Sequence, residues 1–181
     1  MKTVAAAAAI AGGLIFAGVT AVTATRPEGR HGSYRHTDDL GPYLLVAAVL
    51  FAIAAVAFYR SGLTRGNSGR AGVGLIGLGV AAVLGVLAYS VATDGFDSVW
   101  WVLFLGLLFI LAGSLVTGAA LAAARTIPAP TAYTLIATAV LMFLFNTEDA
   151  RAWLGVPFGL AWSWVGLTLL LRSRAPAALT V

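Results

Sequence analysis

Hydrophobic residues fill six long stretches of the chain, and charged residues lie at the ends of these stretches. The uncharged runs hold 20 to 27 residues each. A helix needs about 20 apolar residues to cross the hydrocarbon core of a bilayer, which is about 30 Å thick. The pattern therefore predicts an all-α membrane protein, a six-transmembrane-helix bundle. The predicted helices cover approximately residues 3–25, 40–59, 71–93, 98–124, 128–147 and 152–171.

The composition supports this interpretation, and few residues remain outside the predicted helices to form a second domain. Hydrophobic residues make up 60% of the 181-residue chain and charged residues only 10%, whereas soluble domains are about 25% charged. Six such helices could not all be buried inside a soluble protein of this size. We therefore expect a single transmembrane domain over residues 1–181. Its main connections are an outer loop at 26–39 and an inner loop at 60–70.

The positions of the basic residues predict the orientation of the helices. Short cytoplasmic loops carry more Lys and Arg than external ones. With the N-terminus inside, seven basic residues fall on the inner side and four on the outer side, together with all seven acids. Both termini are therefore predicted to be cytoplasmic, in a multi-pass protein of the cell membrane. The inner set is Lys2, Arg60, Arg65, Arg70, Arg125, Arg172 and Arg174.

The first hydrophobic stretch has two interpretations. "MKTVAAAAAIAGGLIFAGVTAVTA" has a Lys, a long apolar run and an ending that a signal peptidase could cut after Ala24. The apolar run is longer than the usual core of a signal peptide, and Gly12 and Gly13 suit close helix packing. The prediction is a retained helix, with a cleaved signal peptide over residues 1–24 as the alternative.

The predicted spans contain no Asp, Glu, Lys, Arg or His. Proton relays, ion pumps and haem sites usually need such a residue within the membrane. The chain also has no Cys, which excludes disulfides and Cys-ligated metals. The few basic residues lie at helix ends, so the net charge of +4 does not indicate a nucleic-acid partner. We expect no cofactor and no enzymatic activity.

The outer loop contains the main cluster of ionisable residues. The stretch "RHGSYRHTDD" holds both histidines and two adjacent carboxylates, and mixed imidazole and carboxylate ligands suit a zinc-like ion. Helix capping explains the acids without any ligand, and the neighbouring arginines oppose metal binding. The candidate metal ligands, held against that simpler explanation, are His31, His36, Asp38 and Asp39.

Small residues and one proline give candidate packing and ligand positions inside the helices. Small residues four apart let another helix approach closely. Two such stripes occur, and they predict a tight bundle. Pro157 lies inside the sixth predicted helix, where it should cause a kink, as a packing feature or as part of a ligand site. The stripes are Gly77, Ala81 and Gly85 in the third helix and Ser114, Gly118 and Ala122 in the fourth.

The last third of the chain resembles a broad group of multi-helix membrane proteins from high-GC bacteria and haloarchaea. The resemblance rests on "GAALAAARTIPAP" and on the acid-led final helix with "PFGLAW". No activity, cofactor or site residue is known for that group. The resemblance therefore implies the fold and the protein class alone.

Three functions fit this sequence. The first is a non-catalytic accessory or scaffolding subunit, packed in the lipid bilayer against other membrane subunits or a second copy of itself. The second is a small transporter or channel for an uncharged or apolar substrate, built around Pro157 and the hydroxyl side chains of the later helices. The third is a metal-dependent enzyme at the outer face.

Overall fold

The chain folds into a bundle of helices, and the computed structural model describes residues 1–26, 40–64, 66–93, 99–146 and 149–174. No strand occurs among these residues, so the all-α prediction is confirmed for this part of the chain. The helices are α1 (Lys2–Thr25), α2 (Gly41–Arg60), α3 (Gly66–Thr93), α4 (Trp100–Ala123), α5 (Ala129–Leu141), η2 (Met142–Leu144), η3 (Ala150–Leu154) and α6 (Gly155–Arg174).

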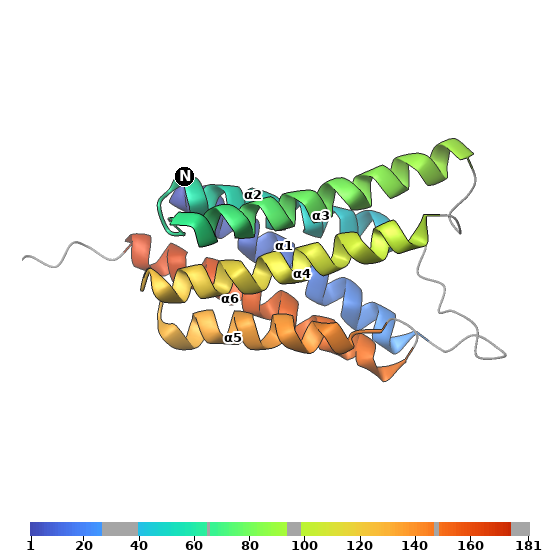
Figure 1. Ribbon diagram of the computed structural model, residues 1–181. Coiled ribbons are helices and arrows are strands. Elements are labelled where there is room, and N and C mark those ends of the chain that lie inside the picture. Colours follow the sequence, from blue (N-terminus) through green and yellow to red (C-terminus); the bar gives the residue numbers. More distant parts are fainter. Residues whose placement is uncertain (27–39, 65, 94–98, 147–148, 175–181) are drawn as a thin grey trace, which may run out of the picture.

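The six α-helices form a closed ring in chain order. Each packs against the next, and α6 returns to pack against α1 (Figure 1). Successive helices run in opposite directions, so α1 begins and α6 ends at the same end of the bundle. Short turns make this possible. Between α2 and α3, for example, Gly62 and Gly66 have φ values of 75° and 86°, a left-handed conformation that glycine adopts without strain.

The connection between α2 and α3 is shorter than the predicted inner loop at 60–70. Helix α3 begins at Gly66, five residues before the predicted start, so Arg70 belongs to the helix. Its Nε donates a hydrogen bond to the hydroxyl of Tyr59, at 2.9 Å. A second contact fixes this turn, because the Thr126 hydroxyl donates to the carbonyl of Leu63. The two turns at this end of the bundle are thereby joined.

Five helices are long and apolar enough to cross a membrane, and α5 is the exception. Its α-helical part has 13 residues, and the single 3₁₀ turn η2 extends it to Leu144. Phe145 is already extended, with ψ at 135°. The predicted helix over 128–147 is therefore too long. Its bounds came from the uncharged run, and that run also includes Ile127 and Pro128 before the helix and Phe145 to Thr147 after it.

Pro157 lies near the start of α6, and the predicted kink there stays a prediction. A 3₁₀ segment, η3, ends at Leu154, and α6 begins at Gly155. Pro157 is therefore the third residue of α6. The N–H groups of the first turn have no partner within a helix, so the missing donor of a proline costs nothing there. Its side chain is exposed.

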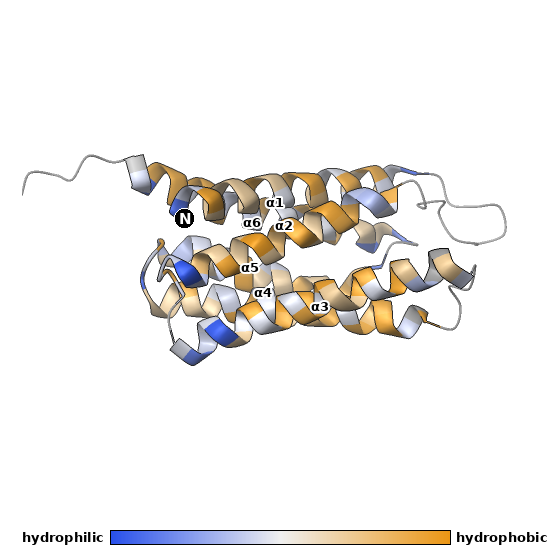
Figure 2. Ribbon diagram, turned by 90° about the horizontal axis from the view of Figure 1, so that it is seen from above, coloured by the Kyte–Doolittle hydropathy of each residue, from blue (hydrophilic) through white to orange (hydrophobic). Residues whose placement is uncertain are grey.

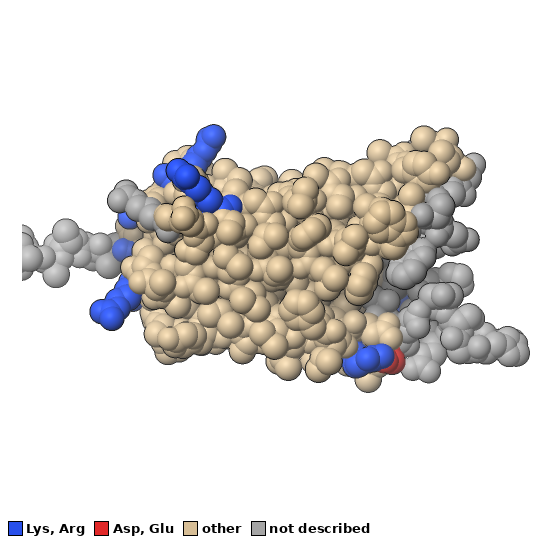
Figure 3. All heavy atoms as spheres, viewed as in Figure 1, with Lys and Arg blue, Asp and Glu red and all other residues tan. Residues whose placement is uncertain are grey.

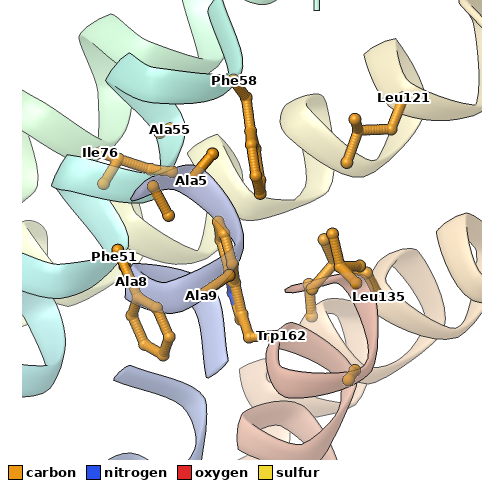
Figure 4. Close-up of a cluster of buried hydrophobic side chains, with 14 of the residues drawn as sticks. Ala5, Ala8, Ala9, Phe51, Ala55, Phe58, Ile76, Leu121, Leu135 and Trp162 are labelled. Carbon is orange, nitrogen blue, oxygen red and sulfur yellow. The ribbon is translucent and has the colours of Figure 1, made fainter. Parts of the chain in front are cut away.

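Aromatic side chains fill the centre of the bundle. Trp162 is fully buried and stacks on Phe51 and Phe58, with ring centroids 4.8 Å and 6.1 Å away. Figure 4 shows its ring beside Ala9 of α1. The Trp162 indole N–H has no hydrogen-bond acceptor among the described residues. An unpaired buried donor is costly, so the stacking must outweigh that cost.

Helix α1 is an integral part of this core. Ala5, Ala6 and Ala9 are completely buried, and the helix lies between α2 and α6. Loss of residues 1–24 would expose Trp162 and the glycine-rich face of α6. The retained helix stays a prediction, with the cleaved signal peptide as its alternative.

Candidate functional site

Two pairs of helices are packed so closely that their glycines cannot be replaced without movement. In α3 and α4, a Cβ atom added to Gly79 would lie 2.5 Å from the carbonyl oxygen of Gly106. One added to Gly113 would lie 3.0 Å from the carbonyl oxygen of Gly72. The two glycines are seven residues apart in each helix, which places them on one face two turns apart.

The same arrangement joins α1 to α6. A Cβ atom on Gly159 would lie 2.5 Å from the carbonyl oxygen of Gly13, and one on Gly166 would lie 2.5 Å from that of Ala6. These small residues are again seven apart in both helices. The Ser163 hydroxyl adds a hydrogen bond of 3.1 Å across this interface to the carbonyl of Ile10. The sequence analysis had indicated Gly13 as suited to close packing, but reasoning about residues four apart missed its partner Gly159 and the α3–α4 glycines.

The predicted stripe in α4 lies inside the bundle. Ser114 is fully buried, and its hydroxyl donates to the carbonyl of Ile110 at 2.7 Å. A Cβ atom on Gly118 would lie 2.9 Å from Cγ1 of Ile136 in α5. Ala122 is half-buried and packs against the hydrophobic core. This face of α4 therefore contributes to packing within the chain.

The predicted stripe in α3 faces outward instead, and the expectation that it tightens the bundle is wrong for this chain. No described atom lies within 4 Å of a Cβ atom built on Gly77 or Gly85, nor on Gly74 one turn earlier. Ala81 is exposed as well. Leu78 and Leu84 beside these positions are 55% and 44% exposed. We call the open row of Gly74, Gly77, Ala81 and Gly85 the outward α3 face.

The charged side chains that the structure describes divide between the two ends of the bundle (Figure 3). Lys2 is the first residue of α1 and Arg70 lies in the second turn of α3 at one end, where α2 ends at Arg60 and Arg172 lies in the last turn of α6. We call this the cationic end. At the other end, Asp149 caps η3 by accepting the backbone N–H of Arg151 at 2.7 Å, and the two side chains form an ion pair.

The predicted metal ligands His31, His36, Asp38 and Asp39 lie outside the described residues. Within the described part of the chain, no group of three or more His, Asp or Glu side chains could hold a metal ion. Asp149, one of the acids predicted to lie outside, serves as a cap and an ion-pair partner, as the capping explanation expects.

Hydroxyl side chains in the helices bond to backbone carbonyls. Thr20 donates to the carbonyl of Phe16 and Thr138 to that of Thr134, each four residues earlier. Such bonds satisfy a hydroxyl in an apolar setting. Together with the exposed side chain of Pro157, they leave the transporter hypothesis without a cluster of free polar groups around that proline in the described residues.

Comparison with known proteins adds no assignment. No protein-family model, curated protein or solved structure matches this chain. The site and the function therefore have to be argued from the chain's own residues. Those residues support a multi-pass membrane protein, with five helices long and apolar enough to span.

Proposed function

We propose that this protein is a non-catalytic accessory or scaffolding subunit of the cell membrane, which packs sideways against another membrane protein through the outward α3 face. The observation that carries this proposal is a contrast within one helix. Helix α4 packs directly against Gly72 and Gly79 of α3. On the outward face of the same helix, Gly74, Gly77 and Gly85 have no neighbour in the described part of the chain.

The physics of helix association in lipid supports this use of the open glycines. Lipid tails are as apolar as leucine, so burial from water does not drive helices together in a membrane. Helices in a membrane associate instead through close approach of their backbones, which increases van der Waals contact. Small residues permit this approach. A glycine in a helix interior otherwise costs about 1 kcal/mol relative to alanine. A partner helix that packs against this face would offset the cost of its several open glycines.

The proposal includes a sixth membrane crossing by α5. From Ala129 to Leu144 the helix has 16 residues, which corresponds to about 25 Å of rise. That is a few ångströms short of a bilayer core of about 30 Å, a mismatch that local thinning accommodates at modest cost. The position of α5 in the ring, between the spanning helices α4 and α6, supports the crossing. The cationic end then faces the cytoplasm.

A single substitution on the outward α3 face tests the proposed role. Gly77→Leu adds a large side chain where a partner backbone would lie, so we expect the co-purifying partner or second copy to be lost in native mass spectrometry after gentle detergent extraction. Thermal stability should stay close to that of the wild type, because no described atom contacts this position.

Gly18→Leu is the matched control for that test. Gly18 is also an exposed helical glycine without a described neighbour within 4 Å, but it lies on α1. The control should keep the partner. A wild-type protein that runs alone as a monomer, or a partner that survives Gly77→Leu, would refute the proposed role.

A further inference from the structure

An open apolar groove runs along the outer surface where α1 meets α2. Met1, which precedes α1, and Val4 of α1 line it on one side. Val49, Ile53 and Val56 line it from α2. Its volume is about 300 Å³. The lining positions on α2 cover about 10 Å of helix length. The groove is open and its lining is apolar, so part of one acyl chain can lie against it.

Cationic side chains lie where the groove meets the cationic end. Arg60 follows Val49, Ile53 and Val56 at helical spacing, so it continues the same face of α2 by one more turn. Lys2 is the neighbour of Met1, which lines the groove. Both side chains are exposed.

No described carboxylate neutralises these two cations. Asp149 is the only acidic side chain in the described part of the chain, and it pairs with Arg151 at the opposite end. The groove is thus apolar along its length and positive at one end. That combination complements a molecule with an apolar chain and an anionic head.

We propose that this groove is a binding site for one anionic phospholipid of the cytoplasmic leaflet. One acyl chain lies along Val49, Ile53 and Val56, and the phosphate lies against Arg60, with Lys2 adding positive charge. A guanidinium binds phosphate through paired charge-assisted hydrogen bonds. Long basic side chains at a membrane surface keep their charged ends at headgroup depth. The site is separate from the outward α3 face and does not depend on the proposed role of that face, but its place in the cytoplasmic leaflet rests on the proposed orientation of the cationic end.

Native mass spectrometry of the full-length protein in detergent can test the headgroup contact. The probes are phosphatidylglycerol and phosphatidylcholine with identical acyl chains. The wild type should retain phosphatidylglycerol in preference, and Arg60→Gln should lower that preference about tenfold, as expected for loss of a charge-assisted hydrogen bond. Arg125→Gln is the control, since Arg125 lies after α4, which does not line the groove. It should change the preference less than twofold.

A second pair of variants tests the groove itself. Ile53→Trp fills the groove and should reduce retention of both lipids, while Val140→Trp on α5 should not. The two positions are comparably exposed, at 42% and 49%. Equal losses for Arg60→Gln and Arg125→Gln would show a general attraction to the cationic end and overturn the proposal. So would unchanged lipid retention in Ile53→Trp, or loss of a protein partner instead of a lipid.

Discussion

Trp162→Ala is expected to lower the free energy of unfolding by about 3 kcal/mol, while Trp162→Phe should change it by less than about 1 kcal/mol. The alanine variant removes the ring that stacks on Phe51 and Phe58 and leaves a cavity at the centre of the bundle. In a membrane protein this loss is one of packing, because the surrounding lipid is itself apolar.

The phenylalanine variant separates the ring from its polar group. It keeps a stacked aromatic ring and removes the indole N–H that has no acceptor among the described residues. Removal of an unpaired buried donor gains about 1–3 kcal/mol, which offsets the smaller contact area of the phenylalanine ring. Thermal unfolding of the purified protein, followed by far-ultraviolet circular dichroism in detergent, measures both variants. Equal destabilisation by Ala and Phe would show that the N–H has a partner and that the packing account of this residue is wrong.

Gly159→Ala is expected to destabilise the bundle by about 1–3 kcal/mol, the usual cost of overpacking a tight interface. The new methyl group would lie 2.5 Å from the carbonyl oxygen of Gly13 and 2.7 Å from the backbone nitrogen of Ala17. Both contacts are with backbone atoms, so no side chain can rotate away. Helices α1 and α6 must move apart, and the hydrogen bond from Ser163 to Ile10 should weaken with them.

The control variant for this prediction should change the stability in the opposite direction. Gly18→Ala adds the same methyl group to a helical glycine with no described atom within 4 Å. Alanine restricts the unfolded chain and favours the helix, so we expect a gain of about 0.4–1 kcal/mol. The same thermal unfolding measurement compares the two variants. If Gly159→Ala were also stabilising, the close approach of α1 and α6 would be contradicted.

The spacing of charged residues was sufficient to predict the class of fold and the approximate position of each helix. Lys2 and Arg26 bracket α1, and Asp39 and Arg60 bracket α2, because a charge is costly in the bilayer core and so marks the end of a span. The ends of α5 were less predictable. An uncharged residue such as Asn146 or Phe145 can stop a helix through local geometry that charge spacing does not record.

The direction in which each helix face points could not be predicted in the same way. A helix of a soluble protein has one apolar side, which identifies the core. Here the helices are hydrophobic along most of their length, as Figure 2 shows, because lipid and protein interior are both apolar. Gly77 and Gly79 therefore looked equivalent in sequence, although one is open and the other is packed against Gly106. Trp162 and Trp164 likewise differ, one buried and one exposed.

The packed small residues recur at a spacing of seven, but this spacing does not distinguish them in the sequence, because Gly74 and Ala81 of the outward α3 face are also seven apart. Gly72 and Gly79 match Gly106 and Gly113, and Gly159 and Gly166 match Ala6 and Gly13. A spacing of seven places two residues on one face of a helix about two turns apart, but the structure is needed to show which face meets another helix. The candidate metal ligands of the outer loop show no paired spacing of this kind in the sequence. They lie outside the described residues.

We propose that six helices cross the membrane and that the cationic end faces the cytoplasm, and α5 provides the most direct test. The chain has no cysteine, so single cysteines can be placed at Ala124 and Ala150, two exposed alanines on either side of α5. Intact cells are then treated with a membrane-impermeant maleimide. The account predicts labelling of Ala150→Cys and protection of Ala124→Cys until the membrane is permeabilised. Labelling of both positions, or of neither, in intact cells would show that α5 does not cross, and labelling of Ala124→Cys alone would show the opposite orientation.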